Sequence, residues 1–310
     1  MILAILLSSL CLCGEAPERA NDFFWENDRV GFRAYGPGDT HKWSGIDVFN
    51  KSVSTNIVVH WLRHHSSPNF HLNQGQGMDN YAVGPGRGVG GVALRKDGKW
   101  LPDYGNWVAY RVKTNSDERC EFELDYKLPI GGIMTLAISM FRGNSYFLER
   151  VSFSKDTPLE GVEVGVGMDC NAERLHVGSL VVDKGLCVVS LFEEPHTLKD
   201  NKRTTAREGG KPIKGEEGST MSAVFPVYSP EGEPWPELSV ADEPNGAKML
   251  MTRPLKAEAA NGKPVVLVAC WADWTEAGRY RTADAWHAAV LGKCKAFLSL
   301  LKMECKVEDK

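Results

Sequence analysis

Short apolar runs separated by turn residues are the feature of this sequence that most constrains its fold. β-branched or alternating residues fill residues 30–35, 46–49, 56–62, 107–113, 121–128, 133–140, 146–153, 162–168, 180–182, 187–191, 221–226, 248–251 and 264–271. Glycine, proline, asparagine and aspartate lie between many of these runs. Many short strands at this spacing predict an all-β protein, built as one large antiparallel β-sandwich.

One segment near the C-terminus has the spacing of a helix. Its apolar residues form a single stripe: Trp286, Val290, Cys294, Phe297, Leu298 and Leu301. Thr282 is suited to cap the first turn. The pattern predicts a helix over residues 283–303 that packs against a sheet, with His287 at the rim of the stripe.

The composition gives no sign of separate domains or of a strongly basic surface. A hydrophobic share of 43% and a charged share of 25% over 310 residues are typical of a soluble globular protein. A formal charge of -4 provides no basic surface, which disfavours nucleic acid and anionic membranes as partners. We find no internal repeat and predict one domain over residues 17–310, in which residues 197–218 form a surface excursion and residues 230–254 an extended connection.

The first residues predict export. Residues 1–12 are apolar but too few to span a bilayer, which suits the hydrophobic region of a secretory signal. We therefore expect a signal peptide over residues 1–16, cleaved between Cys13 and Ala16, and a periplasmic or extracellular protein. No later run has the length of a membrane helix, so we expect no membrane span.

The remaining cysteines allow two interpretations. Cys120, Cys170, Cys187, Cys270, Cys294 and Cys305 form no CxxC pair and match no zinc spacing. They are either buried thiols or the source of one or two disulfides, and the sequence leaves both open. We expect no catalytic thiol, no metal and no cofactor.

A glycine-rich stretch over residues 70–91, FHLNQGQGMDNYAVGPGRGVGG, predicts an irregular loop. Its polar residues are His71, Asn73, Gln74, Gln76, Asp79, Tyr81 and Arg87. Polar side chains that donate, accept and titrate on such a backbone favour a small-molecule site. The alternative is a structural loop with incidental polar residues.

Other candidate ligand-binding residues lie outside this loop. If residues 56–62 form a strand, His64 and His65 lie at its end, towards the loop. A metal site built from these histidines and His71 matches no standard spacing, so contact with sugar or solvent is favoured. Trp43 and Trp274 border turn residues and are candidates for stacking on a sugar, with packing in the core as the alternative.

Several segments together resemble a known family. They are WENDRVGFRAYGP at residues 25–37, SGIDVF at 44–49, the glycine-rich stretch, and WADWTEAGRYRTADAWHAAVLGKCKAFLSLL at 271–301. These resemble the bacterial family catalogued as domain of unknown function 4861, over residues 22–301. The resemblance implies an exported protein of polysaccharide-degrading bacteria, related in fold to the galactose-mutarotase-like β-supersandwiches. It also implies action on uronic-acid oligosaccharides by elimination of water or of a sugar.

The glycine-rich stretch departs from that family at three positions. Where the family is expected to read close to H-x-D-H-G-E-G-x-D-x-Y, this chain has Asn73, Gln74 and Gln76 in place of Asp, His and Glu. A side-chain amide holds a hydroxyl but moves no proton at neutral pH. If these positions carry the family's chemistry, this chain is altered in substrate or inactive.

The chemistry of elimination beside a carboxylate suggests a role for each residue of the family pattern that this chain keeps. A base removes the α proton, an acid protonates the leaving oxygen, and polar groups stabilise the enolate-like charge. His71 is the predicted base, and Tyr81 is the acid, or the base if Arg87 depresses its pKa. Arg87 is also expected to clamp the uronate carboxylate, and Asp79 to orient His71 or hold hydroxyls. The remaining predicted substrate-binding residues are Gln74, Gln76, His65, Trp43 and Trp274.

The predicted function is therefore a lyase or dehydratase whose partner is a uronic-acid oligosaccharide. A mutarotase-type epimerase remains open, because His71 with Asp79 or Asp47 supplies a histidine and a carboxylate. A non-catalytic carbohydrate-binding protein also remains open, because the three amides favour binding without proton transfer. A glycoside hydrolase needs two carboxylates, and Gln76 argues against it.

Overall fold

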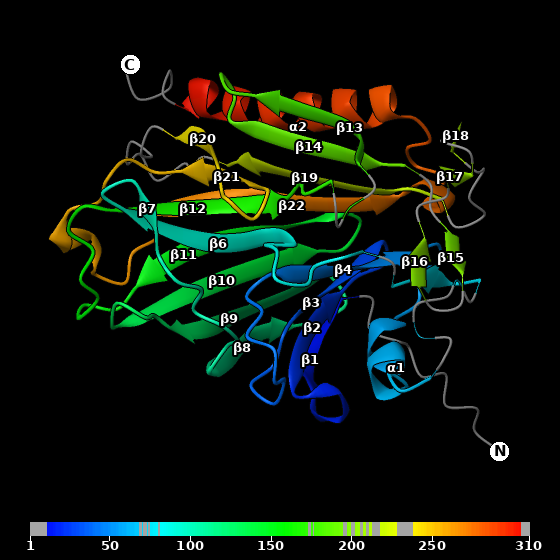
Figure 1. The fold of residues 1–310 in the computed structure, drawn as a ribbon, viewed down its shortest axis with the longest axis horizontal. Coiled ribbons are helices and arrows are strands. Elements are labelled where there is room, and N and C mark those ends of the chain that lie inside the picture. The colour runs from blue at the N-terminus through cyan, green and yellow to red at the C-terminus, as the bar shows by residue number, and fades with distance from the viewer. Residues whose placement is uncertain are drawn as a thin grey trace.

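Three antiparallel sheets make up most of the chain (Figure 1). The computed structural model describes residues 11–67, 70, 73, 75–79, 81–172, 175, 177–194, 197–199, 202–204, 207–208, 211–212, 218–227 and 238–304. The amino-terminal sheet has the order β1 (Leu12–Ala16), β2 (Asp22–Glu26), β3 (Val30–Ala34), β4 (Ile46–Lys51), β5 (Gly77–Met78). A 3-10 turn, η1 (Pro17–Arg19), joins β1 to β2.

An eight-stranded sheet and a second five-stranded sheet complete the architecture. The eight strands lie in the order β13 (Val177–Asp183), β14 (Val188–Glu193), β19 (Thr220–Pro226), β22 (Val266–Trp274), β11 (Tyr146–Phe153), β10 (Ile133–Phe141), β9 (Arg119–Lys127), β8 (Ala109–Asn115). The other sheet has the order β20 (Ser239–Asp242), β21 (Ala247–Met251), β12 (Val162–Asp169), β6 (Val89–Lys96), β7 (Lys99–Trp100). Two short turns, η2 (Ala257–Ala259) and η3 (Thr275–Ala277), flank β22.

Both five-stranded sheets pack on the inner face of the eight-stranded sheet, and one core joins all three. In β9 and β10, alternate residues are buried, as expected for strands with one face in a core. Aromatic rings cross between the sheets: Trp25 of β2 lies 5.2 Å from Phe122 of β9 and 5.4 Å from Phe147 of β11, measured between ring centroids. The predicted all-β antiparallel sandwich is confirmed.

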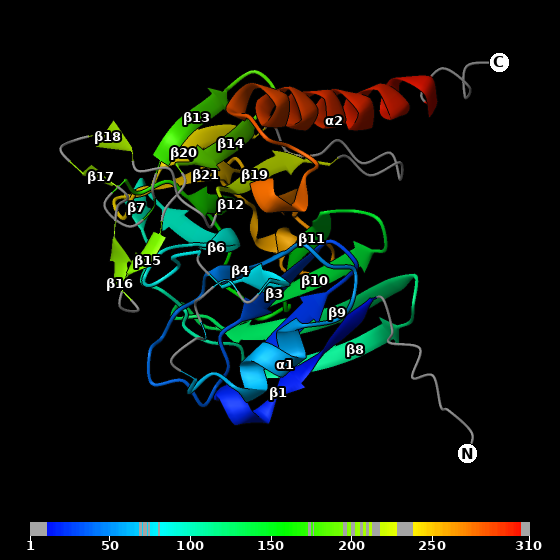
Figure 2. The same ribbon diagram turned by 90° about the vertical axis from the view of Figure 1, so that its right-hand side faces the viewer.

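Helix α2 (Ala283–Glu304) covers the outer face of the eight-stranded sheet at β14 and β19 (Figure 2). Trp286, Val290 and Cys294 are fully buried there, in a second cluster with residues of β19 and β22. Thr282 Oγ1 accepts the Ala285 N–H at 3.3 Å, which caps the first turn. The predicted helix is therefore confirmed, and β22 is buried along its whole length because both of its faces are covered.

The prediction of a strand over residues 56–62 is wrong. These residues enter helix α1 (Val58–Arg63), in which Val58, Trp61 and Leu62 are buried at helical spacing. The carboxylate of Glu26, distant in sequence, accepts the N–H groups of Ile57 at 2.9 Å and Val58 at 3.0 Å. This caps the helix start, because the first N–H groups of a helix have no partner within the helix.

The glycine-rich stretch is a loop only in part. Its last residues begin strand β6, which the glycine content concealed. A Cβ at Gly90 would lie 2.8 Å from both Cys270 Sγ and Glu149 Oε2, so β6 passes too close to the eight-stranded sheet for a side chain there.

Two predicted connections contain strands. Within residues 197–212, β15 (Thr197–Lys199) pairs with β16 (Lys202–Thr204), and β17 (Arg207–Glu208) pairs with β18 (Lys211–Pro212). The expected extended connection over residues 230–254 includes β20 and β21.

Strand β1 falls within the predicted signal peptide. All five of its residues pair with β2, from Leu12 opposite Glu26 to Ala16 opposite Asp22. Cleavage between Cys13 and Ala16 would cut this strand from the sheet. Residues 1–10 lie outside the described part of the chain, and the signal peptide and export remain predictions. Within the described residues, no helix has both the length and the apolar character needed to cross a membrane.

Candidate functional site

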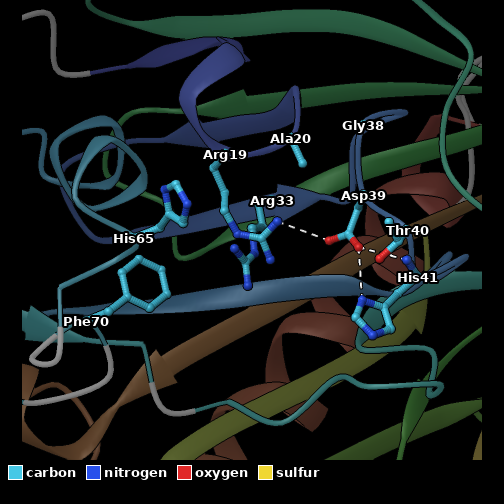
Figure 3. Close-up of a pocket in the computed structure, with 9 residues that line it drawn as sticks. All are labelled: Arg19, Ala20, Arg33, Gly38, Asp39, Thr40, His41, His65 and Phe70. Carbon is cyan, nitrogen blue, oxygen red and sulfur yellow. Dashed lines mark hydrogen bonds and ion pairs between the residues drawn. The ribbon is translucent and has the colours of Figure 1, made fainter.

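One open cleft of about 460 Å3 gathers histidine and arginine side chains from separate segments of the chain. It is lined by Arg19, Ala20, Arg33, Gly38, Asp39, Thr40, His41, His65 and Phe70. Figure 3 shows Arg19 and Arg33 in the middle, with His65 on one side and His41 on the other. We call it the histidine cleft.

The loop between β3 and β4 forms one wall of the histidine cleft. At Gly36 a Cβ would lie 2.1 Å from the backbone of Asn21, so only glycine allows the loop to pack this closely on the turn before β2. Asn106 Nδ2 donates to the carbonyls of Gly36 at 2.7 Å and of Asp39 at 3.2 Å. These contacts hold the loop in place from outside.

A histidine–carboxylate pair lies on this wall. His41 Nδ1 is 3.0 Å from Asp39 Oδ1, and Asp39 Oδ2 accepts a hydrogen bond from Arg19 at 3.0 Å. Burial raises the pKa of Asp39, but the hydrogen bonds from His41 and Arg19 outweigh burial and lower that pKa below its ordinary value. The Trp43 ring stacks on His41 with centroids 4.4 Å apart. The carboxylate therefore stays ionised at neutral pH and orients the His41 ring.

His65 lies on the opposite wall, just beyond the end of α1. Its Nδ1 is 3.1 Å from the carbonyl oxygen of Leu62. A carbonyl only accepts, so Nδ1 carries the hydrogen, and the neutral ring keeps its lone pair on Nε2. The ring is exposed. Its neighbour His64 bonds the His60 carbonyl at 2.8 Å instead and does not line the cleft.

Arg33 is held at the floor of the cleft by buried carboxylates. Its Nε donates to Asp47 Oδ2 at 2.9 Å and its NH1 to Asp22 Oδ2 at 3.2 Å. Burial alone lowers the pKa of Arg33, but Asp47, Tyr35, Asp79 and Asp22 outweigh burial and raise that pKa. Asp47, an alternative carboxylate for an epimerase, is thus paired with an arginine.

Arg87 is occupied by an internal network. It forms a two-pronged ion pair with Glu243, and its NH1 also donates to Ser44 Oγ at 2.8 Å and Asp103 Oδ2 at 3.2 Å. The residue is 4% exposed. In this arrangement the guanidinium anchors the chain around Ser44, and the expected clamp on a uronate carboxylate would require these bonds to break.

Tyr81 and Asp79 are enclosed in the core, 2% and 1% exposed. The Tyr81 hydroxyl donates to the Gly88 carbonyl at 3.3 Å. Burial and then the nearby Asp169 carboxylate raise the pKa of Tyr81 well above its ordinary value. The condition under which Tyr81 would serve as the base, a pKa depressed by Arg87, is therefore not met.

The other predicted site residues are dispersed. Trp274 is 1% exposed and packs inside the molecule, so the described arrangement offers no face of this ring for stacking. Gln76 is exposed beside β5, outside the residues that line the histidine cleft. His71 and Gln74 lie outside the described residues, and their predicted roles are neither supported nor contradicted. Of the predicted residues, the structure brings His65 to the cleft, with Trp43 behind His41.

Sequence reasoning missed Arg19, Arg33, Asp39 and His41. The segment GPGDTHKW at residues 36–43 carries a signal that could have been used, because a turn-rich segment presents an acid and a histidine two residues apart. Arg33 lies in a strand, and its neighbours gave no indication of a cleft. Among the described residues, no group of three or more His, Cys, Asp or Glu is arranged to hold a metal ion.

Comparisons with known proteins give a family, a related sequence and similar solved structures. Uncharacterized protein P7 of Formosa agariphila is 36% identical over 129 residues, which are 37% of this chain and 32% of that protein. The chain thus matches about a third of the relative's length. The heparan sulfate lyase HepC of Pedobacter heparinus has a TM-score of 0.41 at 13% identity, covering 85% of this chain and 36% of that one, and a HepC mutant has a TM-score of 0.41 at 12% identity.

The family model described as domain of unknown function (DUF4861) matches residues 10–203. This stretch contains the amino-terminal sheet, every residue that lines the histidine cleft, and the strands through β15. The resemblance noted in the sequence is confirmed over this stretch, while the segment at residues 271–301 lies outside the match, and the chain belongs to the DUF4861 family.

Proposed function

We propose that this protein is a carbon–oxygen lyase that acts by β-elimination on uronic-acid oligosaccharides in the histidine cleft. The observation that carries the proposal is the presence of two histidines and two arginines around one open cleft. Proton abstraction beside a carboxylate needs a base, an acid and a cation at the carboxylate, and these residue types supply all three.

The base in this proposal is His65. Its Nε2 holds the lone pair and takes the proton from the carbon beside the uronate carboxylate. The electron pair of that C–H bond forms a carbon–carbon double bond, and the C–O bond at the next carbon breaks. His41 protonates the leaving oxygen, which departs as water or as a sugar hydroxyl, and Asp39 at 3.0 Å balances the charge of the protonated His41 ring.

The substrate carboxylate is assigned to Arg19. One of its NH groups binds Asp39, and its side chain is 21% exposed, which leaves part of the guanidinium facing the cleft. Arg33 is 6% exposed and paired with Asp22 and Asp47, so it contributes to the floor rather than to a clamp. Trp43 holds the His41 ring from behind.

The test is absorbance in the unsaturated-uronate band during incubation with a panel of uronic-acid oligosaccharides. We expect a rising signal that falls at least about 100-fold in His65→Ala and in His41→Ala, the range for losing a general acid or base. His64→Ala is the matched control, because it removes an adjacent histidine that does not line the cleft. If both cleft variants kept full activity, the histidine cleft would not be the catalytic site, and His71 would be the next candidate for the base.

Epimerisation is the second candidate. It is favoured by the placement of His65 and His41 on opposite sides of the cleft, since two bases facing one sugar carbon can exchange its proton between faces (Figure 3). Deuterium uptake from heavy water at that carbon, without new ultraviolet absorbance, would select epimerisation over elimination.

A further inference from the structure

Two buried cysteines meet where the amino-terminal sheet approaches the eight-stranded sheet. Cys13 lies in β1 and is 4% exposed, while Cys120 lies in β9 and is 0% exposed. Asn115 joins their strands. Its side chain accepts the Cys13 N–H at 3.2 Å and donates to the Cys13 carbonyl at 3.0 Å, and Asn115 is the residue paired directly with Cys120 across β8 and β9.

The two side chains are also in contact. The Cys120 thiol shares a hydrogen bond with the Cys13 thiol, and both side chains belong to the core that joins the three sheets. Both are free thiols in this structure. Cys11 is also buried and lies two residues before Cys13, just ahead of β1, so it provides an internal comparison.

We propose that, in the chain that keeps β1, Cys13 and Cys120 form a disulfide that fastens this edge strand to β9. The two thiols lose two protons and two electrons and form one S–S bond. The electrons pass to a disulfide oxidant such as oxidised glutathione, which is reduced to two thiols. The hydrogen-bond contact with Cys120 selects Cys13 over Cys11.

The burial of Cys120 favours oxidation during folding, before the core closes. Contact with the Cys13 thiol, followed by burial, raises the pKa of Cys120 well above its ordinary value, so the folded protein holds little of the reactive thiolate. Oxidation therefore accompanies folding. Because β1 leads directly into η1, which carries Arg19, the bond also fixes one side of the histidine cleft.

The test uses the full chain, refolded with a mixture of reduced and oxidised glutathione. Peptide mapping without reductant should recover one linked pair containing Cys13 and Cys120. In denaturant, the number of thiols that titrate should rise on reduction by the two that this bond contains. Linkage of Cys120 to Cys11, or titration of all eight cysteines without reductant, would overturn the proposal.

Thermal unfolding distinguishes the stabilising effect of the disulfide from the effect of core packing at the same cysteines. Reduction should lower the melting temperature of the wild-type protein by about 5–10 °C, the scale expected for a bond that closes a long loop. Cys120→Ala should show no such dependence on reductant, whereas the matched variant Cys11→Ala should keep it. A wild-type melting temperature that is identical with and without reductant would also overturn the proposal, whether or not the variants fold.

Discussion

Lys51 Nζ lies 2.8 Å from Glu26 Oε2, and both side chains are 0% exposed. The same carboxylate accepts the first two N–H groups at the start of α1, from Ile57 and Val58. One buried ion pair thus links β2, β4 and the helix whose far end presents His65. Glu26, which lies in the segment WENDRVGFRAYGP, is therefore a structural residue that fixes the start of the helix preceding His65.

Replacement of Lys51 by Met should destabilise the protein by about 3–5 kcal/mol, because it leaves the Glu26 carboxylate buried without its cation. Urea denaturation measures the change. Adding Glu26→Gln to this variant should recover part of the loss, since the uncompensated charge is then gone. Lys113→Met is the matched control: Lys113 pairs with Glu123 at 3.3 Å but is 52% exposed, so its loss should cost less than about 1 kcal/mol. Equal losses in the two single variants would contradict this account.

Arg87 should prove to be a structural residue. Arg87→Met leaves Glu243 without its buried cation, and we expect a loss of about 3–5 kcal/mol in the free energy of unfolding. Arg95→Met offers a close comparison, because Arg95 also binds a glutamate through two nitrogens but is 24% exposed, and should cost about 1 kcal/mol. An Arg87→Met protein of wild-type stability that had lost binding of a uronic-acid oligosaccharide in calorimetry would restore the carboxylate-clamp role.

Glu149 should make the fold less stable as pH rises. Its side chain is fully buried in β11, its Oε1 has no hydrogen-bond partner among the described residues, and the Cys270 thiol lies 3.8 Å from Oε2. Burial raises the pKa of Glu149 well above its ordinary value, so the folded state favours the neutral acid. The unfolded chain releases this proton near pH 4.5. The stability that the neutral acid provides is therefore complete below that pH and declines above it, by up to about 1.4 kcal/mol per pH unit, until the pKa of the folded state is reached.

The variant Glu149→Gln keeps the shape and removes the titration. Its stability should match that of the wild type near pH 4 and exceed it by about 1–3 kcal/mol at pH 7. Denaturant midpoints at several pH values give the comparison, and Glu258→Gln controls for the loss of one exposed carboxylate. A wild-type advantage that grew from pH 4 to pH 7 would show that Glu149 is ionised and paired in the folded protein.

The strands were predictable wherever one face alone is buried. Residues of β9 and β10 alternate between buried and partly exposed positions. The sequence shows the same alternation, because apolar residues occupy the buried positions. Residues 56–62 were not predictable in this way, because Val58, Trp61 and Leu62 satisfy the spacing of a helix, while the residue that caps the helix is Glu26 in β2. Such long-range contacts leave no local pattern.

The site was less predictable than the fold for the same reason. His65 was found because it lies beside His64 and near His71 in the sequence. Asp39 and His41 lie across the cleft from His65. They are brought to the same cleft only by the order of strands in the amino-terminal sheet. The glycine-rich stretch attracted attention because its polar residues are dense. Two of them, Tyr81 and Arg87, form their hydrogen bonds with buried partners inside the protein.

Removal of residues 1–16 should destabilise the protein, because it deletes β1 and leaves β2 as an unprotected edge. With about 1 kcal/mol for each lost backbone hydrogen bond, the expected loss in the free energy of unfolding is roughly 3 kcal/mol or more. The measurement is urea denaturation under reducing conditions, which excludes any contribution from a disulfide. A chain that lacks only residues 1–10 is the control and should keep the stability of the full chain. If the chain that begins at residue 17 were equally stable, β1 would be dispensable, and cleavage between Cys13 and Ala16 would be compatible with the folded protein.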